Sequence, residues 1–509
     1  MPGGFAIVAV SVDFDYSRVS YTPVTKIRVT KVPEKHLSSP LHNRKRELVE
    51  LERAWRSGKP ELLLALGRRR AGKSYLLRRF LQGRVGFYYQ ATKTTAREQL
   101  RALGEAAAAE SPQSGLGYGS GFRSWDAFFE YIIERAGGRP FALILDELPY
   151  LLEAVRGFGT ILQKQWDNAL QDSKIKLILS GSYISAMTRL TAADQPLHGR
   201  RTGRLHFASF NYLDAAAFVP RYAAVDRLLT YGIFGGLPGQ LAVIDPERSL
   251  AQNVADHLLN PAGRLADEAE HLLDAFTREG GVHYSLIRAI ADGEHRWSRI
   301  TSRVGKNSAS VSRPLEWLQQ MELVAKVIPV TDHPPGNPKK SLYRLADPYL
   351  AFWYRFVAPL RATGAVEVLT PTQLWERHVS PGLSEYMGSV FENICRTFVS
   401  QGAHPALPFL PDRVGEWWSD DQQDQIDVVA LGPKGEVLLG ECKWGNATHQ
   451  DVELLQRRRD IIARELRGIR HVHLALFTSS PAIKDRKLAE QIKQGEIIHL
   501  SAEELLRND

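Results

Sequence analysis

The sequence predicts an α/β protein of several domains, the first of them built on a parallel sheet. Apolar runs at 61–66, 141–147 and 176–182 have the length and composition of buried strands, and helical patterns lie between them. Strands that alternate with helices in this way favour a parallel sheet over residues 41–210. The chain of 509 residues has room for three or four domains, and its 44% hydrophobic content supports an ordinary core.

Composition narrows the class of protein. A net charge of +8 and a pI near 9.3 favour an anionic partner such as DNA. The two cysteines, Cys395 and Cys442, provide neither a disulfide framework nor a zinc site, which predicts a cytoplasmic protein. No apolar stretch approaches the length of a membrane span, so no membrane association is predicted. The apolar run at 5–12 is too short for a signal peptide, and residues 1–40 stay unassigned.

Residues 67–74 contain the first motif that points to chemistry. They fit the pattern G-x-x-x-x-G-K-[ST] and lie between a predicted strand and a predicted helix. The glycines allow a tight turn whose amide groups face phosphates, Lys73 can reach the β and γ oxygens, and Ser74 can ligate Mg²⁺. The pattern predicts ATP and Mg²⁺ as cofactors. The predicted nucleotide-binding loop consists of Gly67, Arg68, Arg69, Arg70, Ala71, Gly72, Lys73 and Ser74.

Two further strand ends are expected at the same edge of the sheet. The strand at 141–147 ends in Asp146, which is expected to hold Mg²⁺, and Glu147, which is expected to polarise the attacking water as general base. The strand at 176–182 contains Ser180 and Ser182, either of which could reach the γ-phosphate or that water. A plain strand-ending turn is the alternative for these serines.

A basic loop precedes a fourth strand predicted at 205–210. Arg200 or Arg201 in this loop is a candidate arginine finger that stabilises transition-state charge. The finger could act within its own chain or from a neighbouring subunit of a homo-oligomer. A solvated basic loop without a catalytic role is the alternative.

The middle of the chain has helical patterns. Residues 211–279, interrupted by glycines at 232–239, are predicted to form a helical lid over the nucleotide. Residues 280–347 contain three short helices followed by two strands, which is the winged-helix order, and residues 348–384 are assigned as a linker. Winged helices also serve as packing modules, so DNA contact is one of two alternatives. The residues predicted to contact a duplex are Ser308, Ser310, Ser312, Arg313, Lys339 and Lys340.

A second candidate site lies in residues 385–509. Strands at 425–431 and 436–444 are joined by a turn and form a predicted hairpin. A period of two places Glu441 and Lys443 on one face, and Asp427 can lie across from them.

Carboxylates gathered at one point repel each other unless a cation lies between them. Mg²⁺ held by Asp427, Glu441 and the Cys442 carbonyl, with Lys443 orienting or activating a water, makes a centre that cleaves phosphodiesters. Glu392, on a helix predicted at 386–400, is placed to add a carboxylate. A surface hairpin with salt-bridging charges is the alternative.

Together these motifs resemble a known family. The chain resembles archaeal and bacterial P-loop ATPases of the AAA/STAND type that carry a C-terminal PD-(D/E)XK nuclease-like domain. The resemblance is carried by residues 43–48, 67–74, 145–151, 179–182, 235–238, 347–356, 391–393 and 440–444. It implies a P-loop NTPase parallel sheet with a helical lid, a winged-helix domain and a C-terminal α/β restriction-endonuclease-like domain over residues 385–509.

The resemblance also implies functional residues. It implies that Lys73, Ser74 and Asp146 bind ATP and Mg²⁺ and that Glu147 is catalytic. It further implies a nuclease-type cluster of Glu392, Asp427, Glu441 and Lys443. One departure from the pattern is that Ile426, rather than proline, precedes Asp427. The first forty residues match nothing in the family pattern.

Two functions from different classes follow from the sequence. The first is an ATPase coupled to Mg²⁺-dependent DNA cleavage or DNA binding. The second is a nucleotide-driven switch or scaffold, in which ATP closes the lid and the C-terminal domain binds DNA or a partner without cleaving.

Overall fold

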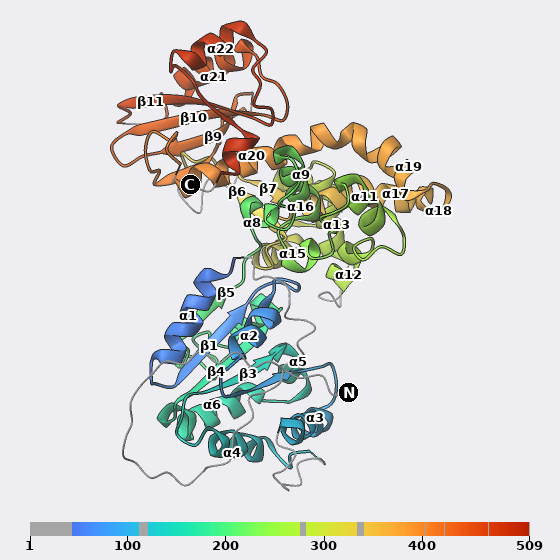
Figure 1. Ribbon diagram of the computed structural model, residues 1–509, viewed down its shortest axis with the longest axis vertical. Helices are drawn as coiled ribbons and strands as arrows, with labels where there is room; N and C mark the ends of the chain where they lie inside the picture. The colour runs from blue at the N-terminus through green and yellow to red at the C-terminus, as the bar shows by residue number, and fades with distance from the viewer. Residues whose placement is uncertain are drawn as a thin grey trace, which may run out of the picture.

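The computed structural model describes residues 43–110, 121–274, 281–332, 340–402, 404–421, 423–466 and 468–507. Three parts follow one another along its long axis (Figure 1). We call them the N-terminal domain (43–210), the middle domain (211–382) and the C-terminal domain (383–507). The unassigned residues 1–40 lie outside the described residues.

The N-terminal domain contains the parallel sheet that the sequence predicts. Every pairing in it is parallel, and the strand order is β2-β3-β4-β1-β5. The predicted strand at 205–210 begins two residues earlier and is shorter in the structure. The strands are β1 (Glu61–Leu66), β2 (Gly86–Gln90), β3 (Phe141–Asp146), β4 (Ile175–Gly181) and β5 (Gly203–His206).

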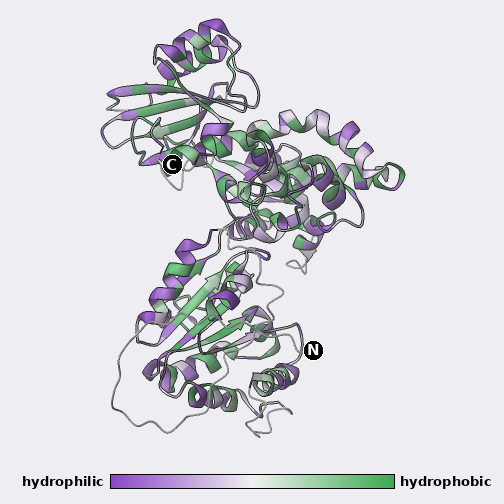
Figure 2. Cartoon of the chain, viewed as in Figure 1, coloured by the Kyte–Doolittle hydropathy of each residue, from purple (hydrophilic) through white to green (hydrophobic). Residues whose placement is uncertain are grey.

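Helices cover both faces of this sheet. Alternate side chains of β1 point to opposite faces, so that Leu62 and Leu64 pack on one side and Leu63 on the other. The strands are accordingly apolar between amphipathic helices (Figure 2). The first face packs against α3 (Ala96–Glu110), α4 (Trp125–Ala136), α5 (Leu148–Ala154) and α6 (Phe158–Asn168), and the second against α1 (Lys45–Arg56) and α2 (Lys73–Leu81).

The middle domain has one continuous apolar core. Residues expected to form separate lid, winged-helix and linker segments all contribute to that core, which also includes Ile184 of the N-terminal domain. The assignment of 348–384 as a linker is corrected, because Tyr349, Phe352 and Trp353 are among its most buried side chains. The segment forms α16 (Pro348–Phe352), η5 (Trp353–Val357), α17 (Ala358–Ala362), α18 (Ala365–Val368) and α19 (Pro371–Leu374).

The element order predicted for residues 280–347 is present in the same domain. Three helices are followed by a two-stranded antiparallel hairpin. The hairpin lies against the C-terminal domain, since Val330 N–H donates to the Glu416 carbonyl at 2.8 Å. The elements are α13 (Gly281–Ala291), α14 (Trp297–Val304), α15 (Ser308–Gln320), β6 (Val324–Val327) and β7 (Leu342–Leu345).

The C-terminal domain is a mixed five-stranded sheet of order β12-β11-β10-β9-β8. One face packs against α20 (Leu383–Gln401) and the other against α21 (His449–Ile462) and α22 (Arg486–Lys493). The hairpin of β9 and β10 is antiparallel as predicted, whereas the sequence did not predict β8. The strands are β8 (Arg413–Trp418), β9 (Gln425–Leu431), β10 (Glu436–Lys443), β11 (His471–Thr478) and β12 (Ile498–Ser501). Among the described helices, none is long and apolar enough to cross a bilayer.

Gly236 and Gly388 provide a matched test of how closely the surrounding atoms pack on the backbone. A Cβ at Gly236 would lie 2.0 Å from the Phe210 carbonyl oxygen, whereas a Cβ at Gly388 within α20 meets nothing within 4 Å. We expect Gly236→Ala to lower the free energy of unfolding by about 2 kcal/mol. Gly388→Ala should raise it by about 0.5–1 kcal/mol because alanine has the higher helix propensity. Denaturant unfolding of the two variants measures both changes, and equal shifts would contradict this account.

Candidate nucleotide site and carboxylate cluster

The predicted phosphate loop lies at the carboxyl edge of the parallel sheet. It connects the end of β1 to the start of α2, next to the ends of β3 and β4. Arg70 and Gly72 have φ angles of 65° and 84°, so the chain passes through the left-handed region just before the helix. This backbone aims the first turn of α2 back over the loop, where helix N–H groups favour an anion.

Lys73 is the central cation of this site. Its ammonium donates to the carbonyls of Gly67 at 2.7 Å and Arg68 at 2.9 Å, and to Ser182 Oγ at 3.0 Å. The Ser182 hydroxyl donates in turn to Glu147 Oε1 at 2.8 Å. Lys73 and Glu147 are therefore joined through one serine, which places the proposed base beside the phosphate loop.

The predicted Mg²⁺ residues also meet. Ser74 Oγ donates to Asp146 Oδ2 at 2.5 Å, and the Tyr88 hydroxyl donates to the same oxygen at 2.6 Å. Asp146 Oδ1 accepts from the Glu147 N–H at 3.0 Å. A hydroxyl and a buried carboxylate side by side are hard oxygen donors, which fits a Mg²⁺ ion bound with nucleotide phosphates. The sequence did not single out Tyr88, because the pairing of β2 with β3 is not visible in it.

Ser182, rather than Ser180, takes part in this network. Ser180 is fully buried, and its hydroxyl has no hydrogen-bond partner within the described ranges. Of the loop arginines, Arg69 is exposed, while Arg68 and Arg70 form ion pairs with the middle domain.

A pH dependence of ATP affinity follows from the burial of Lys73. Burial lowers the pKa of Lys73 to about 8, opposed by the charges of Glu147 and Asp146. A bound triphosphate favours the charged ammonium, so the pKa in the complex is higher than in the free protein. Affinity should be constant below pH 8 and fall by up to about tenfold per unit above it.

Titration of a fluorescent ATP analogue from about pH 7.5 to about pH 10 measures this dependence. Lys73→Arg provides the control, because a guanidinium stays charged over the whole range. A wild-type affinity that does not change between these limits would contradict the role given to Lys73.

Arg200 and Arg201 lie away from the phosphate loop. They precede β5, whose Gly203 is opposite Leu63 of the parallel strand β1, so they lie at the edge where the strands begin. Arg200 donates to both carboxylate oxygens of Asp167, at 2.6 and 2.7 Å. Because the phosphate loop lies at the opposite edge of the sheet, neither arginine is placed to act as an arginine finger within its own chain, and that alternative is corrected. A finger acting on a neighbouring subunit stays a prediction.

The second candidate site brings together the residues that the hairpin pattern predicts. Asp427 Oδ2 on β9 accepts from the Cys442 N–H on β10 at 2.9 Å. Lys443 Nζ lies 3.0 Å from Glu441 Oε1 and 3.2 Å from Asp451 of α21. The charged ends of the two strands therefore form one cluster, which we call the carboxylate cluster.

Cations that the sequence did not assign surround this cluster. Arg458 of α21 lies 3.1 Å from Glu441 Oε2. Arg396 donates to the Asp427 carbonyl at 2.7 Å and lies 3.5 Å from Glu392, one helical turn earlier on α20. That spacing of four residues was the available signal for Arg396, but its direction toward β9 depends on how α20 packs.

The pKa shifts in the cluster show that its carboxylates interact. Burial and the charge of Asp427 raise the pKa of Glu392 and of Glu441. Burial also raises the pKa of Asp427, although the hydrogen bond from the Cys442 N–H opposes this. In the part of the chain that the structure describes, no three His, Cys, Asp or Glu side chains are arranged to hold a metal ion. Mg²⁺ at this cluster therefore stays a prediction.

The predicted DNA contacts of the winged-helix segment are only partly available. Lys340 lies 2.6 Å from Asp420 of the C-terminal domain, so its charge is paired within the chain. The Ser310 hydroxyl donates to Asn307 at the start of α15, and Arg313 is exposed. Lys339 lies outside the described residues, as does the side chain of Ser308. The contact predicted for Lys340 is corrected, because the hairpin packs on β8.

Two family descriptions match this chain. Residues 41–244 match an "ATPase domain predominantly from Archaea", and residues 353–455 match "Archaea bacterial proteins of unknown function". An uncharacterized protein of Methanocaldococcus jannaschii, MJECL04, is 25% identical over 418 residues, which are 82% of this chain and 90% of that protein. The uncharacterized ATP-binding protein MJ0423 of the same organism is 48% identical over 42 residues, which are 8% of this chain and 71% of that protein.

The chain is also similar to solved structures over part of its length. The Walker-type ATPase PABY2304 of Pyrococcus abyssi has a TM-score of 0.48 and 23% identity, over 62% of this chain and 96% of that one. The ORC2 protein of Aeropyrum pernix, in ADPNP–ADP complexes, has a TM-score of 0.44 and 14% identity, over 65% and 97%. The family match covers the segment that contains Lys73, Asp146 and Glu147. The chain belongs to the ATP-binding P-loop ATPases, through an ATPase domain found predominantly in Archaea.

Proposed function

We propose that this ATPase hydrolyses ATP to control a Mg²⁺-dependent centre that cleaves DNA in its C-terminal domain. The observation that carries the proposal is the convergence of Asp427, Glu441 and Lys443 at the ends of two paired strands. Glu392 adds a carboxylate from α20, close enough for the charge of Asp427 to raise its pKa. Charged groups gathered and half-buried in this way are typical of sites rather than of surface hairpins.

The donor set fits a hard divalent cation. Asp427 and Glu441 supply carboxylate oxygens, and the Cys442 carbonyl adds a neutral one. A bound Mg²⁺ would polarise a phosphate oxygen and lower the pKa of a bound water. Lys443, held by Glu441 and Asp451, would orient the scissile phosphate or the attacking water.

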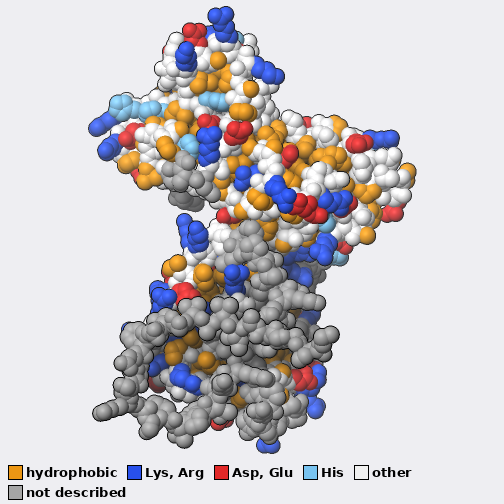
Figure 3. All heavy atoms as spheres, viewed as in Figure 1, with side chains coloured by type: hydrophobic (Ala, Val, Ile, Leu, Met, Phe, Trp, Pro, Cys, Tyr) orange, Lys and Arg blue, Asp and Glu red, His pale blue; other side chains and the backbone are white. Residues whose placement is uncertain are grey.

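DNA is the substrate class that the chemistry favours. A phosphodiester backbone is anionic, and the chain carries a net charge of +8. Arg457 is exposed on α21, next to the arginine that pairs with Glu441. On the face seen in Figure 3, basic and acidic side chains are interspersed, so the net charge alone does not mark a binding surface.

The second candidate function is a nucleotide-driven switch without cleavage. It is favoured by the Arg458–Glu441 ion pair, which already neutralises one of the expected ligands. In such a protein the arginines would replace a metal ion as the partners of the carboxylates.

One experiment separates the two functions. The full-length protein is incubated with Mg²⁺ and either supercoiled plasmid or single-stranded DNA, without nucleotide, with ATP and with a non-hydrolysable ATP analogue. The cleavage proposal expects nicked or degraded DNA that disappears when EDTA replaces Mg²⁺. If ATP is hydrolysed and neither DNA is cut under any condition, the cleavage proposal fails and the switch is favoured.

A further inference from the structure

A buried ion pair joins the phosphate loop to the middle domain. Arg68 Nη1 lies 2.6 Å from Asp347 Oδ2, and the two side chains are only 4% and 3% exposed. The residues are 279 positions apart in the sequence. A buried charge needs its partner, because an unpaired one is strongly destabilising. The loop and the segment at Asp347 are therefore held in one relative position.

Asp347 has a second structural role. Its Oδ1 accepts from the Tyr349 N–H at 2.9 Å and so caps the start of α16. Gly235, at the end of α9 (Ala224–Phe234), packs directly on this carboxylate, since a Cβ there would lie 2.8 Å from Asp347 Oδ1. The segment that follows Gly235 returns to the loop, where the Gly239 N–H donates to the Arg70 carbonyl at 3.0 Å.

The pair also bears on Lys73. The Arg68 carbonyl accepts from Lys73 Nζ at 2.9 Å, so the backbone that the ion pair holds is the backbone that orients the ammonium. The Arg68 guanidinium points away from the loop and into the middle domain. Arg68 can therefore transmit a change in the loop's conformation to Asp347 without contacting phosphate.

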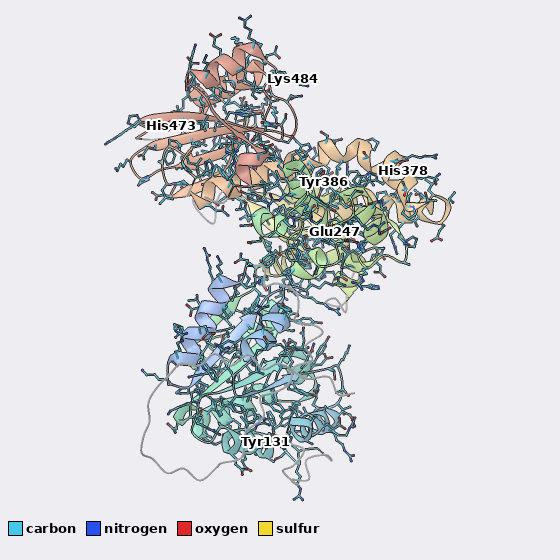
Figure 4. The ribbon with its side chains drawn as sticks, in the orientation of Figure 1. Tyr131, Glu247, His378, Tyr386, His473 and Lys484 are labelled. Atoms are coloured by element: carbon cyan, nitrogen blue, oxygen red, sulfur yellow. The ribbon has the colours of Figure 1, made fainter. Side chains whose placement is uncertain are left out.

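A continuous path leads from Asp347 to the carboxylate cluster. The Tyr386 hydroxyl, near the start of α20, lies 2.8 Å from the Pro348 carbonyl and 2.6 Å from the Gly232 carbonyl. Figure 4 shows Tyr386 where the middle domain meets the C-terminal domain. Six residues further along α20 is Glu392, and four beyond that is Arg396, which holds the Asp427 carbonyl. One 19-residue helix thus touches both the Asp347 segment and the cluster.

We propose that Asp347 is a positioning residue that couples nucleotide at the phosphate loop to the C-terminal domain through Arg68, Tyr386 and α20. In the ATP-bound protein the loop is fixed by phosphate, Arg68 fixes Asp347, and α20 is held in a defined position. The control of DNA cleavage by this path rests on the proposed function, whereas the coupling of the loop to α20 does not.

The test compares the full-length wild type with the double variant Arg68→Met/Asp347→Asn. Removing both charges avoids an unpaired buried charge, so this variant should fold, and the asparagine oxygen can still cap α16. We expect its affinity for a fluorescent ATP analogue to fall about tenfold, within the usual range of coupling between sites. The KM for ATP should rise more than kcat falls. Hydrogen exchange of residues 383–401 should slow on addition of ATP in the wild type and not in the variant.

Glu268→Gln provides the matched control. It removes the partner of the neighbouring Arg70, but that pair is partly exposed, at 31% and 20%, unlike the buried pair of Arg68 and Asp347. We expect its affinity and its exchange pattern to stay close to those of the wild type.

Three results would overturn the proposal. In the first, the double variant binds ATP and protects α20 from hydrogen exchange like the wild type. In the second, Glu268→Gln loses ATP affinity and protection of α20 to the same extent as the double variant. The third is measured on the wild type and does not depend on whether the double variant folds. Hydrogen exchange of residues 383–401 that does not change on addition of ATP refutes the coupling. An absence of DNA cleavage alone tests the proposed function and leaves this measurement unaffected.

Discussion

Replacing Glu147 with glutamine should abolish most ATP hydrolysis while ATP still binds. Glu147 Oε1 accepts a hydrogen bond from Ser182, and a glutamine oxygen can accept the same bond. The amide cannot take a proton from water, so the rate should fall by about 10²- to 10⁴-fold, as for loss of a general base. Phosphate release and binding of a fluorescent ATP analogue measure the two properties separately.

The backbone at Glu147 supports this role. Its φ of 51° lies in the left-handed region, which is costly for a residue with a side chain and typical of positions held for function. The strain belongs to the backbone, so glutamine should share it and the fold should be unaffected. Glu130→Gln, on the exposed face of α4, is the control and should hydrolyse ATP normally. Wild-type turnover by Glu147→Gln would remove this residue from the mechanism.

The sequence predicted the elements whose environment is local. The strands β1, β3 and β4 are runs of apolar residues that a parallel sheet buries on both faces, and their burial is complete in the structure. The same logic placed Lys73, Asp146 and Glu147 at one edge, because parallel strands end together. Asp427, Glu441 and Lys443 were predicted from the two-residue period of a hairpin.

Features that depend on distant parts of the chain were not predictable. The pairs Arg68–Asp347, Arg200–Asp167 and Lys340–Asp420 each join elements whose relative position is decided by packing. In the sequence, where these partners are not visible, each of these cations looked available for an anionic ligand. The supposed linker failed for a related reason, since its aromatic residues have no strand or heptad period and find their core against distant segments, among them α9 and α13.

Replacing Lys443 with alanine should abolish DNA cleavage and leave ATP hydrolysis unchanged. The ammonium lies between Glu441 and Asp451, and alanine removes the only cation on β10 that can face a scissile phosphate. We expect the nicking rate of supercoiled plasmid to fall by about 100-fold or more. The fold should survive, because Lys443 is 34% exposed and a partly solvated ion pair contributes little.

Lys487→Ala is the matched control for this variant. Lys487 also pairs with a glutamate, Glu453 at 2.7 Å, but both side chains are more than half exposed and lie on the outer helices. It should cut DNA like the wild type. Equal nicking by all three proteins would show that the cutting activity does not come from the carboxylate cluster. Loss of ATP hydrolysis in Lys443→Ala would contradict the expectation that Lys443 acts in DNA cleavage alone.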